Sequence, residues 1–456
     1  MASLYPSDHT FAVAPVPARN SLSSQIGLYS ILAANFGFWI AVGIGLGPLS
    51  VSFSQVFIII AFATCLFQWG TSADRIPAST RAALRPIVWT SIAMIGVGMA
   101  SMVTAADPIG GVRFISRWAF GMLYLIAFVQ FVVDDKRGLR KAIRAFLYGG
   151  VAIVPLLLVG RFYSPLGELV FWDLYSYRAN GFMEHPNQFA MISLVGLVLA
   201  QLPGLMNRKL WLFVVLALLF NLVSAGSKAN MVLAVLILPV VFFWLPAREG
   251  RAVQALGGIG AGFIAAFAAI GAGIYYLQTY NSYYYGKLVE FALDPTGADT
   301  TQSRGETWSR SIDCMLERPV FGIGGGNAEY CIDYVHAHNV FVNYLLETGI
   351  VGFITLLAFL VLIIYPLTQV SKKLAYGLGA SAYNTQLFRS AGLVLMAIVL
   401  FIFSNSTSDS LGSSTMPVIW MLAGIGLAMN TIIHRKAARP QVRSKLRPAA
   451  APPKVS

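Results

Sequence analysis

The sequence predicts an all-α polytopic membrane protein with about 12 transmembrane helices. Hydrophobic residues make up 57% of the 456 residues and charged residues only 11%, and a water-soluble domain of this size does not need so much apolar surface. Several apolar runs exceed the roughly 18 residues that suffice to cross a bilayer as a helix. The runs are continuous, whereas the strands of a membrane β-barrel would be about 10 residues long and would alternate.

Twelve apolar runs give the predicted spans, and a polar tail flanks them at each end. The predicted boundaries are 26–46, 50–69, 86–104, 114–132, 145–160, 188–204, 210–226, 230–246, 253–277, 339–369, 390–405 and 415–433. Residues 1–25 lack a basic segment followed by a cleavage site, so we expect no removable signal peptide. Residues 434–456 are basic and proline-rich, and we expect a disordered tail that either rests on anionic lipid headgroups or simply ends the last span. Residues 26–433 then form one transmembrane domain.

The positions of the basic residues predict the orientation in the membrane. If the N-terminus is cytoplasmic, the inside segments are the two tails and the five short loops near 75–85, 133–144, 205–209, 247–252 and 371–389. These segments hold 23 of the 32 Lys and Arg residues, so the positive-inside rule places both termini in the cytoplasm. The net charge of +13 reflects this bias, and no nucleic-acid partner is needed to explain it.

Two long segments fall on the predicted outer face, at 161–187 and 278–338. The second, between predicted spans 9 and 10, contains Cys314 and Cys331, which are 17 positions apart. A disulfide is chemically allowed on this oxidising side, and the sequence leaves open whether it forms. Cys65, inside the second span, is expected to be a small buried apolar residue.

Nine basic residues depart from the inside bias, and a cation outside or within a span needs a reason because it opposes insertion. They are Arg113, Arg117, Arg161, Arg178, Lys228, Lys287, Arg304, Arg310 and Arg318. We expect Arg178, Lys228 and Arg304, which lie in polar, glycine-containing segments, to form a shared anion site at the outer surface. Three others, Lys287, Arg310 and Arg318, are more simply explained as ordinary loop charges.

The stretch that enters the tenth span carries polar side chains into an apolar run. In a helix from residue 339 onward, Asn339, Asn343 and Glu347 recur every four residues and share one stripe. Polar groups at membrane depth must face protein or a water-filled cavity, so we expect the stripe to line a binding site with His338 at its mouth. Gly349 and Gly352 are expected to allow a close helix contact just beyond it.

Cations, a histidine and a lipid-facing cavity suit a substrate with an anionic head and an apolar tail, such as a polyprenyl-diphosphate-linked sugar. Arginine side chains can bind phosphates in a bidentate manner. They would also stabilise the negative charge that develops as the diphosphate leaves. The histidine would act as a base toward an acceptor hydroxyl, or orient it.

Five segments, in this order along the chain, resemble the O-antigen ligase family, which also includes Wzy-type and exopolysaccharide polymerases. They are "RANGFMEHPNQFA", "SAGSKAN", "SRGETW", "ERPVFGIGGGN" and "HNVFVNYLLETGIVG", between about Arg178 and Gly352. The resemblance implies a fold related to the GT-C glycosyltransferases. It also implies a reaction without metal or other cofactor, in which a glycan leaves undecaprenyl diphosphate at the periplasmic face of the bacterial inner membrane.

The resemblance assigns roles to residues by their position. His338 matches the essential histidine of the family, and Arg178 and Arg304 match its outside arginines, so these three are the expected catalytic residues. Lys228 lies where many members have arginine, and lysine keeps the charge but loses the planar fork. The expected substrate-binding residues are Lys228, Asn187, Asn339, Asn343 and Glu347.

The sequence leaves alternatives for the function. A ligase transfers the glycan to lipid A-core, whereas a polymerase transfers it to another carrier-linked repeat unit. A carrier-lipid flippase or oligosaccharide transporter would also have about a dozen spans and central cations, but the long outer segment and the lack of an internal repeat favour an enzyme. A structural assembly partner without activity would leave the arginines and His338 unexplained.

Overall fold

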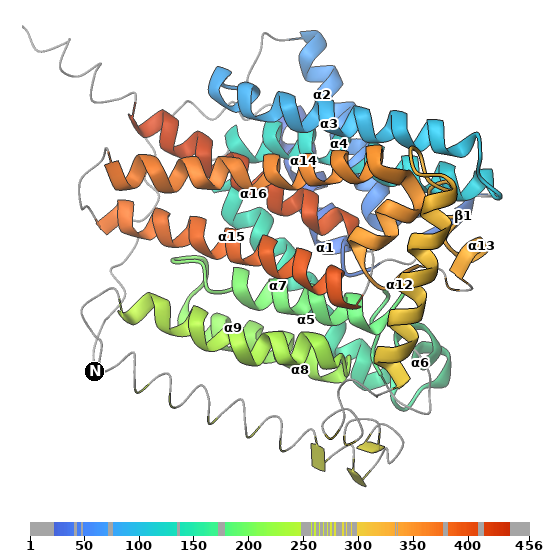
Figure 1. Ribbon diagram of the computed structural model, residues 1–456. Helices are drawn as coiled ribbons and strands as arrows, with labels where there is room; N and C mark the ends of the chain where they lie inside the picture. The colour runs from blue at the N-terminus through green and yellow to red at the C-terminus, as the bar shows by residue number, and fades with distance from the viewer. Residues whose placement is uncertain are drawn as a thin grey trace, which may run out of the picture.

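The computed structural model describes residues 22–40, 43–46, 49–71, 76–134, 137–171, 178–247, 299–332, 334, 336–376, 382–408 and 415–437, with isolated residues between 257 and 293. Most of this part of the chain is helical (Figure 1). The elements are α1 (Leu22–Gly37), β1 (Gly43–Leu46), β2 (Leu49–Ser52), α2 (Phe53–Thr71), α3 (Ala78–Met102), α4 (Pro108–Asp134), α5 (Gly138–Gly160), α6 (Ser164–Val170), α7 (Pro186–Leu199), α8 (Arg208–Ser224), α9 (Lys228–Ala247), α12 (Asp299–Glu317), α13 (Glu329–Ile332), α14 (Val340–Tyr376), α15 (Ala382–Ser408) and α16 (Met416–Ala437). Most of the predicted ninth span and nearly all of both predicted tails lie outside the described residues.

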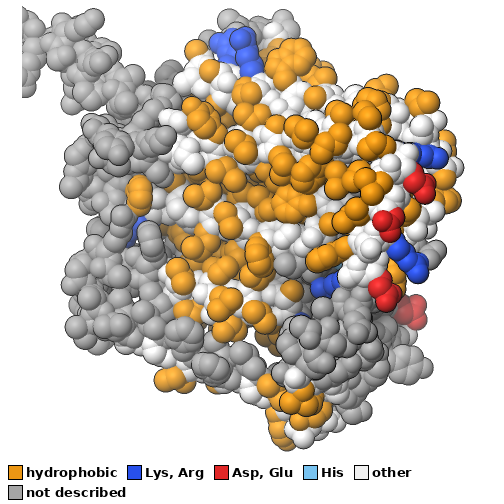
Figure 2. All heavy atoms as spheres, in the orientation of Figure 1, with side chains coloured by type: hydrophobic (Ala, Val, Ile, Leu, Met, Phe, Trp, Pro, Cys, Tyr) orange, Lys and Arg blue, Asp and Glu red, His pale blue; other side chains and the backbone are white. Residues whose placement is uncertain are grey.

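Five of the described helices are long and apolar enough to cross a membrane, namely α3, α4, α5, α14 and α15. Four shorter apolar helices accompany them, in α2, α7, α9 and α16. Figure 2 shows apolar side chains spread over one face of the bundle, with the charged side chains gathered mainly toward the end where α12 lies. These features confirm the predicted all-α membrane protein, whereas the number of 12 spans stays a prediction.

The first predicted span, 26–46, is wrong in its second half. Helix α1 ends at Gly37, and residues 43–46 pair with 49–52 in an antiparallel hairpin. Helix α2 consequently begins at Phe53, after the predicted start of the second span. Hydropathy does not distinguish an apolar hairpin from an apolar helix, but the stretch "GIGLGPLS" contains three glycines and a proline, which are the poorest helix formers.

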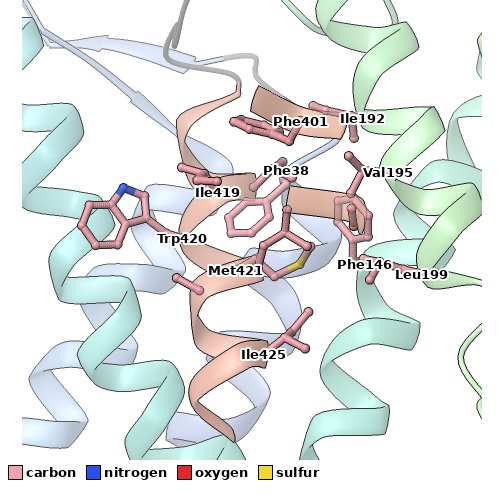
Figure 3. Close-up of a cluster of buried hydrophobic side chains, with 14 of the residues drawn as sticks. Phe38, Phe146, Ile192, Val195, Leu199, Phe401, Ile419, Trp420, Met421 and Ile425 are labelled. Atoms are coloured by element: carbon pink, nitrogen blue, oxygen red, sulfur yellow. The ribbon is translucent and has the colours of Figure 1, made fainter. Parts of the chain in front are cut away.

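The helices pack around large buried side chains. Figure 3 shows one such cluster, in which five segments of the chain meet through Phe38, Phe146, Ile192, Val195, Leu199, Phe401, Ile419, Trp420, Met421 and Ile425. Beside it, Trp118 of α4 meets Trp420 of α16 and Phe359 of α14 edge to face, with ring centroids 5.7 and 4.9 Å apart. A Cβ on Gly121 would overlap the Trp420 indole, so glycine permits this approach. The contacts fix α14 relative to α4 and α16.

The segments predicted to lie outside gather at one end of the bundle. In Figure 1, α6, α12, α13 and the β1–β2 hairpin all lie at that end, and α12 runs across the ends of the other helices. The described part of the predicted outer loop 278–338 is therefore largely helical, whereas no helix was predicted there. This end of the bundle holds the candidate site.

Helix α14 is broken at Gly349, whose φ of 62° and ψ of −166° are not helical. The backbone groups freed by the break bind the preceding segment 318–327, where the Ile350 N–H donates to the Pro319 carbonyl at 2.9 Å. A Cβ on Gly349 would overlap the Val320 carbonyl. Interrupted helices at membrane depth need such backbone partners. Gly349 therefore forms a break in the helix. The predicted close helix contact lies at Gly352, where an added Cβ would be 3.2 Å from Cγ1 of Val97 on α3.

The same segment is fastened to α14 and to the α3–α4 turn. The Ile323 N–H donates to the Leu346 carbonyl at 3.1 Å. Asn327 binds both backbone groups of Asp107, because its Oδ1 accepts from the Asp107 N–H at 2.6 Å and its Nδ2 donates to the Asp107 carbonyl at 3.0 Å. The stretch "ERPVFGIGGGN" thus joins α3, α4 and the broken helix.

Candidate active site

His338 lies two residues before the start of α14 and has an unusual backbone conformation. Its φ of 51° lies in the left-handed region that non-glycine residues seldom occupy. Its N–H donates to Nδ1 of His336 at 3.2 Å. The two imidazole rings meet edge to face, with centroids 4.4 Å apart. A second histidine therefore holds the backbone and the ring of His338.

The peptide groups on either side of Ala337 are fixed by two other side chains. The Ala337 N–H donates to Oδ1 of Asn343 at 3.0 Å, and its carbonyl accepts from the Trp308 indole N–H at 2.8 Å. Asn343 also hydrogen bonds with Glu347, and both side chains are buried. The residue before His338 is thus tied to α12 on one side and to α14 on the other.

Asn339 and Glu347 complete the polar stripe of α14. Asn339 caps the helix, because its Oδ1 accepts from the backbone N–H groups of Phe341 at 2.9 Å and Val342 at 3.2 Å. Glu347 hydrogen bonds with the backbone of Gly326. The three predicted residues of the stripe therefore have partners inside the protein that hold the loop before α14 and segment 318–327.

Arg178 lies beside the turn between α8 and α9. The Ala179 N–H donates to the Ser224 carbonyl at 2.9 Å, and Nε of Arg178 donates to the Ala225 carbonyl at 3.2 Å. Gly226, with a φ of 59°, brings the turn close against the Arg178 side chain. Lys228 begins α9 two residues later. The segments "RANGFMEHPNQFA" and "SAGSKAN" therefore meet in space.

His185 and Asn187 open α7. His185 is the N-cap, and its Nδ1 accepts from the Asn187 N–H at 3.2 Å. The Asn187 carbonyl accepts from Nδ2 of Asn230 at 3.2 Å, and Oδ1 of Asn230 accepts from the Ser404 hydroxyl at 2.7 Å. A buried polar network thus joins α7, α9 and α15 next to the turn that carries Lys228.

These segments also interact electrostatically. Burial lowers the pKa of His185 from 6.5 to about 4, and interactions with Arg178, His338 and Arg304 act in the same direction. Burial also lowers the pKa of Arg304. We call the group formed by Arg178, His185, Arg304, His336 and His338 the outer cationic site, after the outer face on which the sequence predicts these residues.

His336 is neutral for similar reasons. Burial lowers its pKa from 6.5 to about 3, and electrostatic interactions with His338, His185 and Arg117 act in the same direction. Arg117, on α4, also interacts electrostatically with Glu347. In both neutral imidazoles Nδ1 accepts a backbone N–H, so the ring proton is on Nε2. His185 and His336 therefore present a hydrogen-bond donor at Nε2.

Comparison with known families now identifies the central part of the chain. The family model described as O-antigen ligase matches residues 212–357. Residues 212–357 are therefore similar to an O-antigen ligase domain, and we refer to this matched region as the ligase domain. The match confirms the resemblance predicted from the sequence, and it supports an activity of ligase or polymerase type in polysaccharide biosynthesis. No curated protein matches the chain.

The ligase domain contains Lys228, Arg304 and His338, whereas Arg178 and Asn187 precede it in the sequence. The structure attaches these two residues to the domain, because the Arg178 side chain donates to the Ala225 carbonyl and the Asn230 side chain donates to the Asn187 carbonyl. The outer cationic site is thus built by the ligase domain together with the segment before α7.

Four residues at or beside the site were not among the predicted site residues, namely His185, His336, Trp308 and Arg117. His185 lies inside the quoted segment "RANGFMEHPNQFA", where a histidine before Pro-Asn starts a helix. Trp308 lies inside "SRGETW", and Arg117 is a cation within a predicted span. The sequence signals were present, but the contacts of these side chains depend on how distant segments meet.

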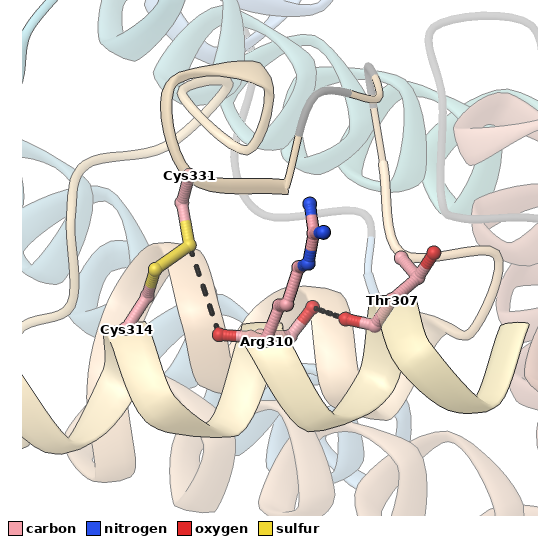
Figure 4. The surroundings of a disulfide bond; sticks show 5 residues. Thr307, Arg310, Cys314 and Cys331 are labelled. Carbon is pink, nitrogen blue, oxygen red and sulfur yellow. Dashed lines mark hydrogen bonds between the residues drawn. A yellow bond between two sulfur atoms is a disulfide. The ribbon is translucent and has the colours of Figure 1, made fainter. Parts of the chain in front are cut away.

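A disulfide within the ligase domain joins α12 to α13. Cys314 and Cys331 are bonded, with Cα atoms 6.5 Å apart (Figure 4). Cys331 Sγ also lies 3.8 Å from the carbonyl oxygen of Arg310. Arg318 donates to the Thr104 carbonyl at the end of α3, so it has a structural role. Cys65 is buried, as predicted.

Proposed function

We propose that the protein is a periplasmic-face glycosyltransferase that moves a glycan from undecaprenyl diphosphate onto a sugar acceptor in surface polysaccharide biosynthesis. The outer cationic site carries this proposal, because its arginines and histidines come from three separate segments and meet at one end of an apolar bundle. The proposed location is the bacterial inner membrane, with both termini cytoplasmic and a fold related to the GT-C glycosyltransferases.

In the proposed reaction, the acceptor hydroxyl oxygen attacks the anomeric carbon of the donor sugar. The bond between that carbon and the diphosphate oxygen breaks, and the diphosphate leaves with the electron pair. His338 takes the proton of the hydroxyl. Arg178 and Arg304 bind the diphosphate and stabilise the charge that develops on it. The reaction as proposed needs neither a metal nor another cofactor.

The proposed substrate-binding residues are Lys228, Asn187, Asn339, Asn343 and Glu347. Lys228 binds a phosphate oxygen as a point charge, since it lies on the turn that also holds Arg178. Asn339, Asn343 and Glu347 bind backbone groups around the site. The Asn187 backbone is itself bound by the side chains of His185 and Asn230. The proposed contribution of the asparagines and Glu347 is the shape of the site, which they keep rigid.

The test uses purified protein in lipid nanodiscs with a carrier-linked repeat unit as donor. Lipid A-core or further repeat unit is offered as acceptor, and the product formed distinguishes a ligase from a polymerase. His338→Ala should reduce the transfer rate about 10²–10⁴-fold. Arg178→Lys and Arg304→Lys should also be severely impaired, because lysine keeps the charge but loses the planar fork. His336→Ala should have a smaller effect than His338→Ala.

Arg310→Lys is the matched control, because Arg310 is an exposed cation on the same helix as Arg304. It should transfer glycan at the rate of the unchanged protein. Transfer at the unchanged rate in the His338→Ala, Arg178→Lys and Arg304→Lys variants would contradict the proposal. Movement of the labelled donor across proteoliposome membranes without any product would indicate a carrier-lipid flippase.

A further inference from the structure

The motif "SRGETW" places Arg304 and Trp308 four residues apart on α12, so they lie one turn apart on the same side of the helix. The proposed reaction gives Arg304 a role but leaves Trp308 without one. The Trp308 indole N–H donates to the Ala337 carbonyl at 2.8 Å, across 29 residues of chain. That carbonyl belongs to the peptide bond leading into His338.

The backbone at His338 needs external support. A residue with a φ of 51° occupies a sparsely populated conformation, and such conformations persist where the surroundings over-determine them. Three side chains supply this support: Trp308 binds the Ala337 carbonyl, Asn343 binds the Ala337 N–H, and His336 binds the His338 N–H. Among the three, Trp308 is the one contributed by α12.

The surroundings of Trp308 make this support rigid. Trp308 packs against a small buried cluster formed by Ala328, Ile332, Ala337 and Leu346. The Cys314–Cys331 disulfide fixes α12 a second time, further along the helix. A shift of α12 would therefore move Arg304 and the peptide before His338 together.

We propose that Trp308 is a positioning residue for His338, and that α12 sets the spacing between His338 and Arg304 through the Trp308 hydrogen bond. The inference rests on the proposed function, in which His338 takes a proton while Arg304 binds the leaving diphosphate. Both groups must be in place for the same transition state, and a misplacement of about 1 Å can reduce a rate about 100-fold.

The decisive variant is Trp308→Phe, which keeps an aromatic ring in the cluster and removes the N–H donor. Replacement of Trp308 by benzothienylalanine, in which sulfur replaces the indole N–H, provides a second variant of nearly the same shape. Each should lower kcat about 10- to 100-fold, with the KM for the carrier-linked donor within about twofold of the unchanged value. Trp211→Phe is the matched control, because Trp211 is also half-buried and its indole N–H donates to Gln201 at 3.3 Å. Trp211 lies near the start of α8, away from the α8–α9 turn that contacts Arg178.

A double-mutant cycle with His338→Ala tests whether Trp308 acts through His338. If it does, Trp308→Phe should cause no further loss in the residual activity of the His338→Ala protein. Multiplicative losses would overturn the inference, and so would a kcat within twofold of the unchanged protein for both Trp308 variants. Failure of the proposed function looks different, since the unchanged protein would then form no product or would be insensitive to His338→Ala.

Discussion

At the residue scale, the outer cationic site combines permanent charges with imidazoles that stay neutral. The arginines keep their charge at any accessible pH, while burial and the neighbouring cations lower the pKa of His185 and His336. Charge repulsion among the site residues is thereby limited before an anionic substrate arrives. The neutral rings still offer Nε2–H donors, because their Nδ1 atoms accept backbone N–H groups.

His185 should contribute to stability through its cap and through its neutral state. His185→Ala removes the acceptor for the Asn187 N–H, so we expect a loss of about 1 kcal/mol in the free energy of unfolding at pH 7.5. Asparagine places an acceptor near the position of Nδ1 and is a favoured N-cap. His185→Asn should therefore unfold at the same temperature as the unchanged protein at pH 7.5.

The stabilities of the unchanged protein and of the His185→Asn variant should differ when the pH is lowered. With a folded pKa of about 4 against an ordinary 6.5, His185 binds more proton in the unfolded chain. Its contribution is complete above pH 6.5 and is lost as the pH falls toward 4. Thermal unfolding between pH 7.5 and 5 should therefore show a smaller loss for His185→Asn than for the unchanged protein. Equal losses would mean that His185 does not titrate as described.

At the scale of single elements, the break in α14 depends on Gly349. A side chain there would meet a positive φ and overlap the Val320 carbonyl. Gly349→Ala should therefore displace segment 318–327, lower the melting temperature by several degrees and reduce transfer. Gly392→Ala on α15 is the control, because nothing lies within 4 Å of the Cβ it would add, and helix propensity favours alanine there by up to about 1 kcal/mol. Similar melting temperatures for the two variants would contradict this account of the break.

Some of these elements were predictable from local sequence patterns, and others were not. Continuous apolar runs predicted most of the described spanning helices, since hydropathy and length are local properties. They failed at residues 43–46, where pairing between neighbouring strands decided the structure. The stripe of α14 was predicted from helical spacing. Its contacts were not predictable, because the partners Ala337 and Gly326 come from other segments.

At the scale of the whole molecule, the two ends of the bundle differ in chemistry. The outer cationic site and α12 lie at one end, while α8 begins with Arg208 and Lys209 at the other. If both termini are cytoplasmic, the α12 end faces outward. Ser309→Cys should then react with a membrane-impermeant maleimide on intact cells. Lys209→Cys should react only after the membrane is permeabilised, and the reverse pattern would invert the topology. The native Cys65 is buried, and a parallel labelling of the unchanged protein measures its background.

The broken helix also has a consequence for exchanging parts between related proteins. Surface loops usually tolerate replacement because few other backbone groups depend on them. Segment 318–327 is different, since its peptide groups complete the hydrogen bonding of a helix interrupted at Gly349. Its Asn327 side chain also binds the α3–α4 turn. A chimera that takes this loop alone from a relative would separate it from the helix it fits. The smallest transplantable unit runs from α12 to beyond the break in α14, and it carries Arg304, Trp308 and His338 with it.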